Sequence, residues 1–183
     1  VGRPYALSAK VLAGLNSTQK RQIINGIVGS IYTLHHFMPP LPHRGLRPGC
    51  YYVCRQGANC RAVLALFSTK TVYGELNSLL QNVTDRMYIA PELSGGSARP
   101  GELTKADIYS LGRLIAFVYT GEPRADLDDL RIPCAMVELV QKLTDLDPAR
   151  RPDIDAVRAR PAPCLWCGGL PRHPPPAGGC AVG

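Results

Sequence analysis

The longest periodic pattern in the chain runs over residues 17–37, STQKRQIINGIVGSIYTLHHF. Hydrophobic residues recur there every three or four positions, which is the spacing of one face of an α-helix. These residues are Ile23, Ile24, Ile27, Val28, Ile31 and Leu34. Ser17 is the expected N-cap, and three prolines between residues 39 and 42 end the pattern. His35 and His36 fall at the C-terminus of this helix, where the helix dipole favours a cation.

Shorter hydrophobic patterns occupy the rest of the chain. Residues 4–15 predict a short helix, and helical spacing returns over residues 104–120, ended by Gly121, and over residues 134–146. Two β-like runs at residues 50–54 and 61–67 predict a hairpin, and residues 68–87 are polar and irregular.

These patterns predict one mainly α domain with a small β-hairpin insert over residues 1–159. From residue 160 to residue 183 the composition is dominated by proline and glycine, which cannot hold a regular element. We therefore expect a disordered tail there.

Composition argues against several functions. The 21 basic and 14 acidic residues give a formal net charge of +7, but they form no basic run, so a specific nucleic-acid surface is not expected. No apolar run reaches the roughly 18 residues of a membrane span, and the first residues lack the apolar core of a signal peptide. The seven cysteines do not have the spacing of a disulfide scaffold. We expect an intracellular, most simply cytoplasmic, protein with reduced thiols.

Five short motifs follow one another along the chain. They are HRGLRPGC at residues 43–50, LALFS at 64–68, YIAPEL at 88–93, DIYSLG at 107–112 and LDPARRP at 146–152. In this order they resemble the catalytic loop, the magnesium-binding motif, the end of the activation segment, the start of a buried helix and the closing motif of a eukaryotic protein kinase. The resemblance covers about residues 5–158. It implies a kinase-like C-terminal lobe, with the nucleotide-binding N-terminal lobe absent or largely truncated.

The resemblance also implies structural roles for single residues. Glu92 would pair with Arg151, and Asp107 would accept hydrogen bonds from backbone amides of the catalytic loop. His43 and Phe67 would stack in a hydrophobic column. The positions with an implied structural role are therefore His43, Arg44, Phe67, Glu92, Asp107 and Arg151.

The residues that carry phosphoryl transfer in the family are replaced in this chain. Gly45 stands where the catalytic aspartate would be, Cys50 where the magnesium-binding asparagine would be, and Leu66 where the magnesium-binding aspartate would be. Glycine cannot act as a base, and leucine offers no oxygen to a hard cation. Tyr52 takes the place of an aliphatic residue under the adenine and would crowd a nucleotide. We therefore expect no cofactor.

Two acids in the irregular region, Glu75 and Asp85, are the candidates to replace the missing carboxylates. The simpler expectation for both is a solvated loop carboxylate.

The tail contains a further group of potential ligands. Cys164, Cys167, His173 and Cys180 supply four ligands of the types that zinc prefers. Their spacing matches no standard zinc module and their surroundings are rich in proline and glycine. No metal site is predicted, and these four residues remain the weak candidates for one.

Three functions stay open at this stage. The first is a pseudokinase, a kinase-like module that binds a protein partner such as a kinase or a kinase substrate. The second is a fragment of an active Ser/Thr kinase that uses ATP and magnesium, with its N-terminal lobe upstream and its missing acids supplied from elsewhere. The third is a kinase remnant without function. The losses at residues 45, 50 and 66 favour the first hypothesis over the second.

Overall fold

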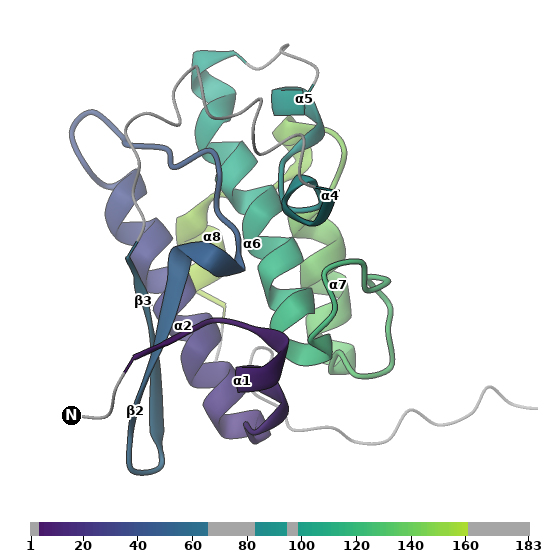
Figure 1. The fold of residues 1–183 in the computed structure, drawn as a ribbon. Helices are drawn as coiled ribbons and strands as arrows, with labels where there is room; N and C mark the ends of the chain where they lie inside the picture. The colour runs from purple at the N-terminus through teal and green to yellow at the C-terminus, as the bar shows by residue number, and fades with distance from the viewer. Residues whose placement is uncertain (1–3, 66–82, 95–98, 161–183) are drawn as a thin grey trace, which may run out of the picture.

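A computed structural model describes residues 4–65, 83–94 and 99–160 of the chain. Helices form most of it, with a small antiparallel sheet beside them (Figure 1). In chain order the elements are β1 (Tyr5–Ala6), α1 (Ala9–Ala13), α2 (Ser17–His35), the 3-10 turn η1 (Pro48–Cys50), β2 (Tyr51–Gln56), β3 (Asn59–Leu64), α4 (Val83–Arg86), α5 (Pro91–Ser94), η3 (Pro100–Glu102), α6 (Leu103–Thr120), α7 (Cys134–Leu143), η4 (Pro148–Arg150) and α8 (Ile154–Arg158). This agrees with the predicted mainly α domain with a hairpin.

The predicted long helix is α2, and its first residue is not its cap. Asn16, one position before Ser17, accepts a hydrogen bond from the Gln19 amide at 2.9 Å. The Gln19 side chain accepts one from the Asn16 amide at 3.1 Å, which completes a capping box. The prediction of Ser17 as N-cap was therefore wrong, because Asn16 has a suitable partner three residues further on. The helix ends at His35, two residues before the predicted end.

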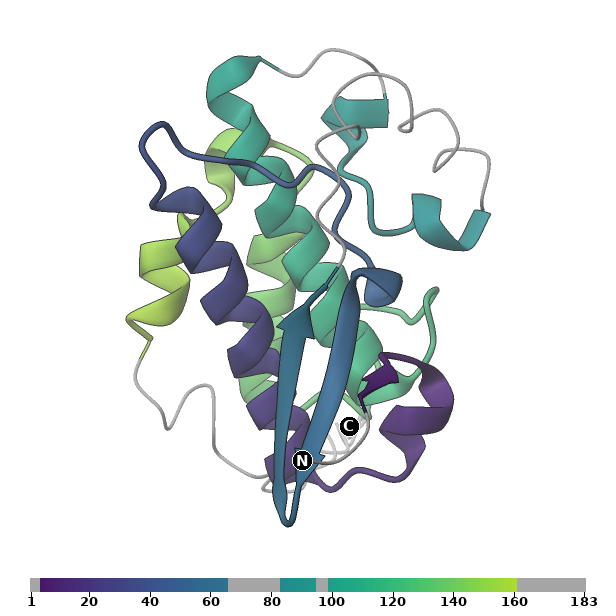
Figure 2. The ribbon, with the colours of Figure 1, turned by 60° about the vertical axis from the view of Figure 1, so that its left-hand side comes forward.

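The sheet has the order β1-β2-β3, and both pairs are antiparallel. Side chains alternate between its faces, so that Tyr51 and Val53 are buried while Tyr52, between them, is 36 % exposed. The hairpin lies beside α2 (Figure 2). Its strands occupy residues 51–56 and 59–64, a tighter hairpin than the predicted runs at 50–54 and 61–67.

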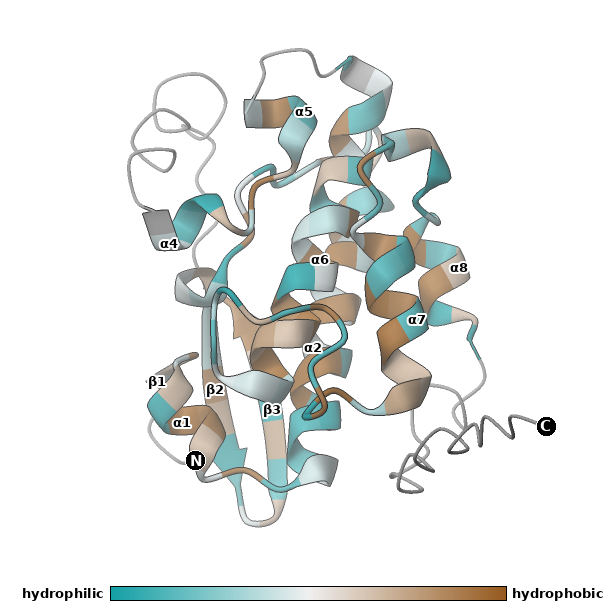
Figure 3. Cartoon of the chain, turned by 90° about the vertical axis from the view of Figure 1, so that its right-hand side faces the viewer, coloured by the Kyte–Doolittle hydropathy of each residue, from teal (hydrophilic) through white to brown (hydrophobic). Residues whose placement is uncertain are grey.

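Helix α6 is buried along most of its length and packs against α2 and α7. Both α6 and α7 carry many hydrophobic residues (brown in Figure 3), and one large core joins them to α2 and the sheet. Gly121 ends α6 with a φ of 75°, in the left-handed region that glycine tolerates, as the sequence predicted. Among the residues that the structure describes, no helix combines the length and apolar character needed to cross a membrane.

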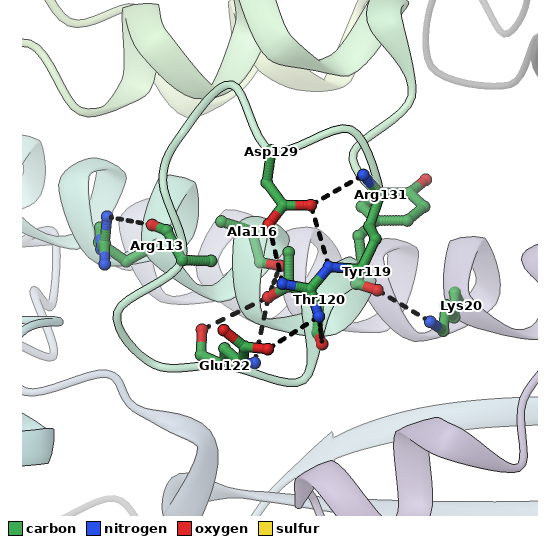
Figure 4. A network of polar contacts seen from close by, with 9 residues as sticks. Lys20, Arg113, Ala116, Tyr119, Thr120, Glu122, Asp129 and Arg131 are labelled. Carbon is green, nitrogen blue, oxygen red and sulfur yellow. Dashed lines mark hydrogen bonds and ion pairs between the residues drawn. The ribbon is translucent and has the colours of Figure 1, made fainter. Parts of the chain in front are cut away.

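A network of polar contacts stabilises the loop between α6 and α7 (Figure 4). Arg131 forms ion pairs with Asp129 at 2.8 Å and with Glu122 at 2.9 Å. Hydrogen bonds from Arg131 lower the pKa of Asp129 to about 2. Lys20 in α2 donates a hydrogen bond to the Tyr119 carbonyl at 3.0 Å, which ties this end of α6 to α2.

Candidate functional site

The candidate site is the segment of residues 43–50, which lies between α2 and β2 and is anchored by α6. Asp107, in the second turn of α6, is fully buried. One of its carboxylate oxygens accepts a hydrogen bond from the His43 amide at 2.7 Å, and the other accepts one from the Arg44 amide at 2.7 Å. Charge-assisted bonds of this kind are among the stronger ones, and they compensate for burial of the carboxylate. Asp107 therefore fixes where the segment begins.

A third group meets the same carboxylate. His35, at the last turn of α2, places Nε2 at 3.0 Å from an Asp107 oxygen, and its side chain is only 7 % exposed. Sequence reasoning missed this contact, because it treated His35 as a cation at the end of a helix. The signal was there: His35 follows Ile27 and Ile31 at four-residue spacing and so continues the buried face of α2.

The backbone turns sharply at Arg44, whose φ is +63°. A residue other than glycine in this region carries strain of roughly 1–3 kcal/mol. The turn lets the consecutive amides of residues 43 and 44 reach one carboxylate. The strain is thus offset by the two hydrogen bonds to Asp107.

The end of the segment is packed rather than open. Leu46 and Cys50 are buried, and the Cys50 thiol donates a hydrogen bond to the Gly45 carbonyl at 3.5 Å. Burial raises the pKa of the Cys50 thiol, and the nearby charge of Asp85 raises it further, against a lowering by Arg47. The thiol is the nucleophile only when ionised, so Cys50 is a poor nucleophile near neutral pH.

One acid does approach the segment from outside. Asp85, in α4, lies 3.4 Å from the Arg47 guanidinium, and its side chain is 25 % exposed. The expectation of a solvated loop carboxylate was therefore wrong for Asp85. Residues 43–50 themselves include no carboxylate, and Asp85 is paired with the Arg47 cation of this segment. Glu75, the other candidate, lies outside the described residues.

A second buried polar cluster lies at Arg151, which is 1 % exposed. Arg151 makes a two-pronged ion pair with Glu92, with nitrogen to oxygen distances of 2.6 and 3.0 Å. Its remaining N–H groups donate to the carbonyls of Asp145, Lys105 and Leu146. Since an arginine has five such donors, the whole guanidinium is satisfied. This cluster joins α5, α6 and the turn before α8.

The structure therefore divides the predicted positions into groups. One group lies around Asp107 and contains His43, Arg44, Gly45 and Cys50, whereas Glu92 and Arg151 form the separate cluster. Leu66 and Phe67 lie outside the described residues, as do the four zinc candidates Cys164, Cys167, His173 and Cys180. Tyr52 lies on the outer face of the sheet, opposite the partly exposed Val63.

Within residues 4–65, 83–94 and 99–160, no three His, Cys, Asp or Glu side chains are placed to hold a metal ion. Around the segment the described groups are a buried thiol, backbone carbonyls, cations and two carboxylates. The amides of residues 43 and 44 donate to Asp107, and Arg47 pairs with Asp85. Both carboxylates therefore already have hydrogen-bond or ion-pair partners within the protein. No protein-family model matches the sequence, and neither does any curated protein.

Proposed function

We propose that this chain is a protein-kinase-like domain without phosphotransfer activity, which acts as a protein-interaction or regulatory module. The observation that carries the proposal is the segment of residues 43–50. Asp107 anchors its backbone through two 2.7 Å hydrogen bonds. The positions that would supply a base and a metal ligand are Gly45 and the buried thiol of Cys50.

The arrangement of the other motifs supports the same proposal. The resemblance pairs Glu92 with Arg151 and joins Asp107 to the loop, and these residues are in contact although they lie about 60 positions apart. Such long-range contacts do not follow from helical or strand periodicity. The resemblance implies both contacts, and their presence supports the proposal.

The environment of the segment argues against an active kinase. Loss of a general base alone lowers rates by about 10²–10⁴, and phosphoryl transfer also depends on metal ions that neutralise charge on the phosphates. Two described acids lie beside the segment, and both have partners: the amides of residues 43 and 44 donate to Asp107, and Arg47 pairs with Asp85. A replacement for the missing acids would first have to break one of these interactions.

A thermal-shift titration with ATP tests the proposal. We expect the same melting temperature with ATP and magnesium, with ATP and a chelator, and without nucleotide, because residues 43–50 contain no side-chain carboxylate or amide to bind the metal. Saturable stabilisation that requires magnesium would contradict the proposal. Transfer of radiolabelled phosphate from ATP to a generic protein substrate by the wild-type chain would contradict it as well.

A further inference from the structure

A groove of about 800 Å³ lies between α2 and β3, and none of residues 43–50 lines it. Figure 1 shows α2 and β3 next to each other, and α8 contacts α2 as well. Tyr32 and Thr33 of α2 form one wall, Val63 and Leu64 of β3 form the other, and Arg158 comes from α8.

Two glycines of α2 shape the groove. A Cβ atom at Gly26 would lie 2.7 Å from the Ala62 carbonyl oxygen, so the helix touches the strand there. A Cβ atom at Gly29 would meet nothing within 4 Å. The helix and the strand are thus in close contact at one end of the groove and leave open space about one helical turn further along.

The strand presents its unpaired edge to this space. The Ala65 amide donates to the Cys50 carbonyl of the neighbouring strand segment at 2.9 Å. In an antiparallel pair every second residue forms its backbone hydrogen bonds with the partner strand, so Val63 and Arg61 bond to β2 as well. The backbone groups of Ala62 and Leu64 then point outward, away from β2. The Cys60 amide follows the same pattern and donates outward to the Gln22 side chain at 2.8 Å. Within the described residues, the outward backbone groups of Leu64 have no hydrogen-bond partner.

The groove also carries uncompensated positive charge. Arg61 and Arg158 line it, and none of its lining residues within the described part of the chain is acidic. The Arg158 guanidinium lies over the Tyr32 ring, 4.0 Å from the ring centre, which holds that cation at the wall. Neither arginine forms an ion pair with a described residue.

We propose that this groove binds an extended, acidic peptide segment of a partner protein. The peptide adds to the edge of β3 at Leu64, and its carboxylates lie against Arg61 and Arg158. Strand addition supplies affinity through main-chain hydrogen bonds, and the side-chain contacts supply specificity. The inference deepens the interaction role proposed above and rests on it.

The chain's own tail is a poorer match to this groove. It begins close to Arg158 in sequence, but residues 161–183 contain no acidic residue and include Arg172. The charge of the groove therefore favours a segment from another protein.

Fluorescence anisotropy with the full chain tests the proposal. The probes are a short labelled peptide that alternates glutamate with valine, the same peptide with lysine in place of glutamate, and the glutamate peptide with alternate backbone amides methylated. We expect saturable binding of the glutamate peptide alone, weakened by salt because exposed charges are screened.

Variants of the groove make the test specific. Arg61→Glu combined with Arg158→Glu should abolish binding. Gly29→Leu should weaken binding about tenfold or more, because the leucine side chain fills the open space. The helix itself should remain stable, because leucine has a higher helix propensity than glycine. Arg124→Glu, an exposed site outside the groove, makes the same charge change as each groove substitution and should bind as the wild type does.

Several outcomes would overturn the proposal. They are equal binding of the glutamate and lysine peptides, undiminished binding of the methylated peptide, and undiminished binding by the double arginine variant. Trp166 in the tail is the only tryptophan. If no peptide binds to the wild type, and the Trp166 emission is shifted to the red in Gly29→Leu, then the tail occupies the groove of the wild type and the substitution displaces it. In that case the proposal fails. Failure to bind the peptide would not contradict the proposed lack of phosphotransfer activity, because the experiments with ATP test that separately.

Discussion

Arg151 uses every donor of its guanidinium, and this determines how the residue responds to substitution. Removing one partner of a buried ion pair costs about 3–5 kcal/mol, because the other charge is left without compensation. Lysine keeps the charge but not the five donors, so we expect Arg151→Lys to lower the free energy of unfolding by about 1–3 kcal/mol, the cost of buried acceptors left without donors. A lysine cannot make the two-pronged contact with Glu92 and also serve the three carbonyls. Urea unfolding followed by circular dichroism measures the change.

The matching variant on the other side of the pair is Glu92→Gln, which keeps a hydrogen-bond acceptor but removes the charge. It should also destabilise the protein, whereas Arg150→Lys, at an exposed neighbouring position, should have little effect. If Arg151→Lys unfolds at the same urea concentration as the wild type, the 2.6 and 3.0 Å contacts do not stabilise the fold. Exchanging the two charges should rescue little, because the three carbonyls would lose their donors.

Single residues were predictable from the sequence to different degrees. Gly121 was found, since glycine after a helical pattern has one common role. The N-cap was missed by one position, because Asn16 and Ser17 are both good caps and the choice depends on Gln19. His35 was missed because its partner, Asp107, is 72 positions away. Local patterns carry no information about such a partner.

Helices α6 and α7 touch at a glycine, and this contact sets their separation. A Cβ atom at Gly112 would lie 2.6 Å from the Thr144 methyl carbon and 2.9 Å from the Leu143 Cβ atom. We expect Gly112→Ala to destabilise the protein by about 1–3 kcal/mol, because the two helices would have to move apart. The midpoint of urea unfolding measures this change.

Gly29→Ala is the control for Gly112→Ala, since it makes the same substitution in a helix with open space around the new methyl group. It should stabilise the protein by about 0.5–1 kcal/mol, the gain expected from helix propensity alone. Stabilisation by Gly112→Ala would mean that α6 and α7 are not in close contact at this point.

At the scale of elements, length decided what the sequence could predict. Helices α2, α6 and α7 are long enough to show a helical period, and each was predicted to within three residues at its ends. Strand β1 has two residues and helix α8 has five, with only Ile154 and Val157 of α8 buried. A pattern cannot be recognised over so few positions, and the two elements form where they contact β2 and α2, respectively.

The arrangement of the whole molecule was less predictable than its elements. Periodicity identifies a helix but does not say which other element it meets. The contact between Asp107 and the segment of residues 43–50 was expected from the order of the five motifs, not from any local pattern. The groove between α2 and β3 was not expected at all, because it depends on the space left beside Gly29.

Part of the segment of residues 43–50 is packed in the main hydrophobic core, and the reactivity of Cys50 measures how well it stays packed. Cys50 and Cys60 are 1 % and 5 % exposed and lie in the same hydrophobic core as α2, α6 and α7, whereas Cys134 is exposed. A buried thiol reacts only when the structure opens, and opening of a core segment approaches the cost of global unfolding. For a stability of about 5 kcal/mol or more, Cys50 should react with an alkylating reagent at least about a thousandfold more slowly than Cys134.

Peptide mapping by mass spectrometry after timed alkylation gives the rate at each cysteine. In concentrated urea the rates of Cys50 and Cys134 should converge, because the difference comes from the fold and from the burial that raises the pKa of the Cys50 thiol. Comparable rates without urea would show that the segment opens independently of the core. In that case the hydrogen bonds to Asp107 would not hold it closed, and the interpretation of residues 43–50 as a fixed loop without catalytic groups would be wrong.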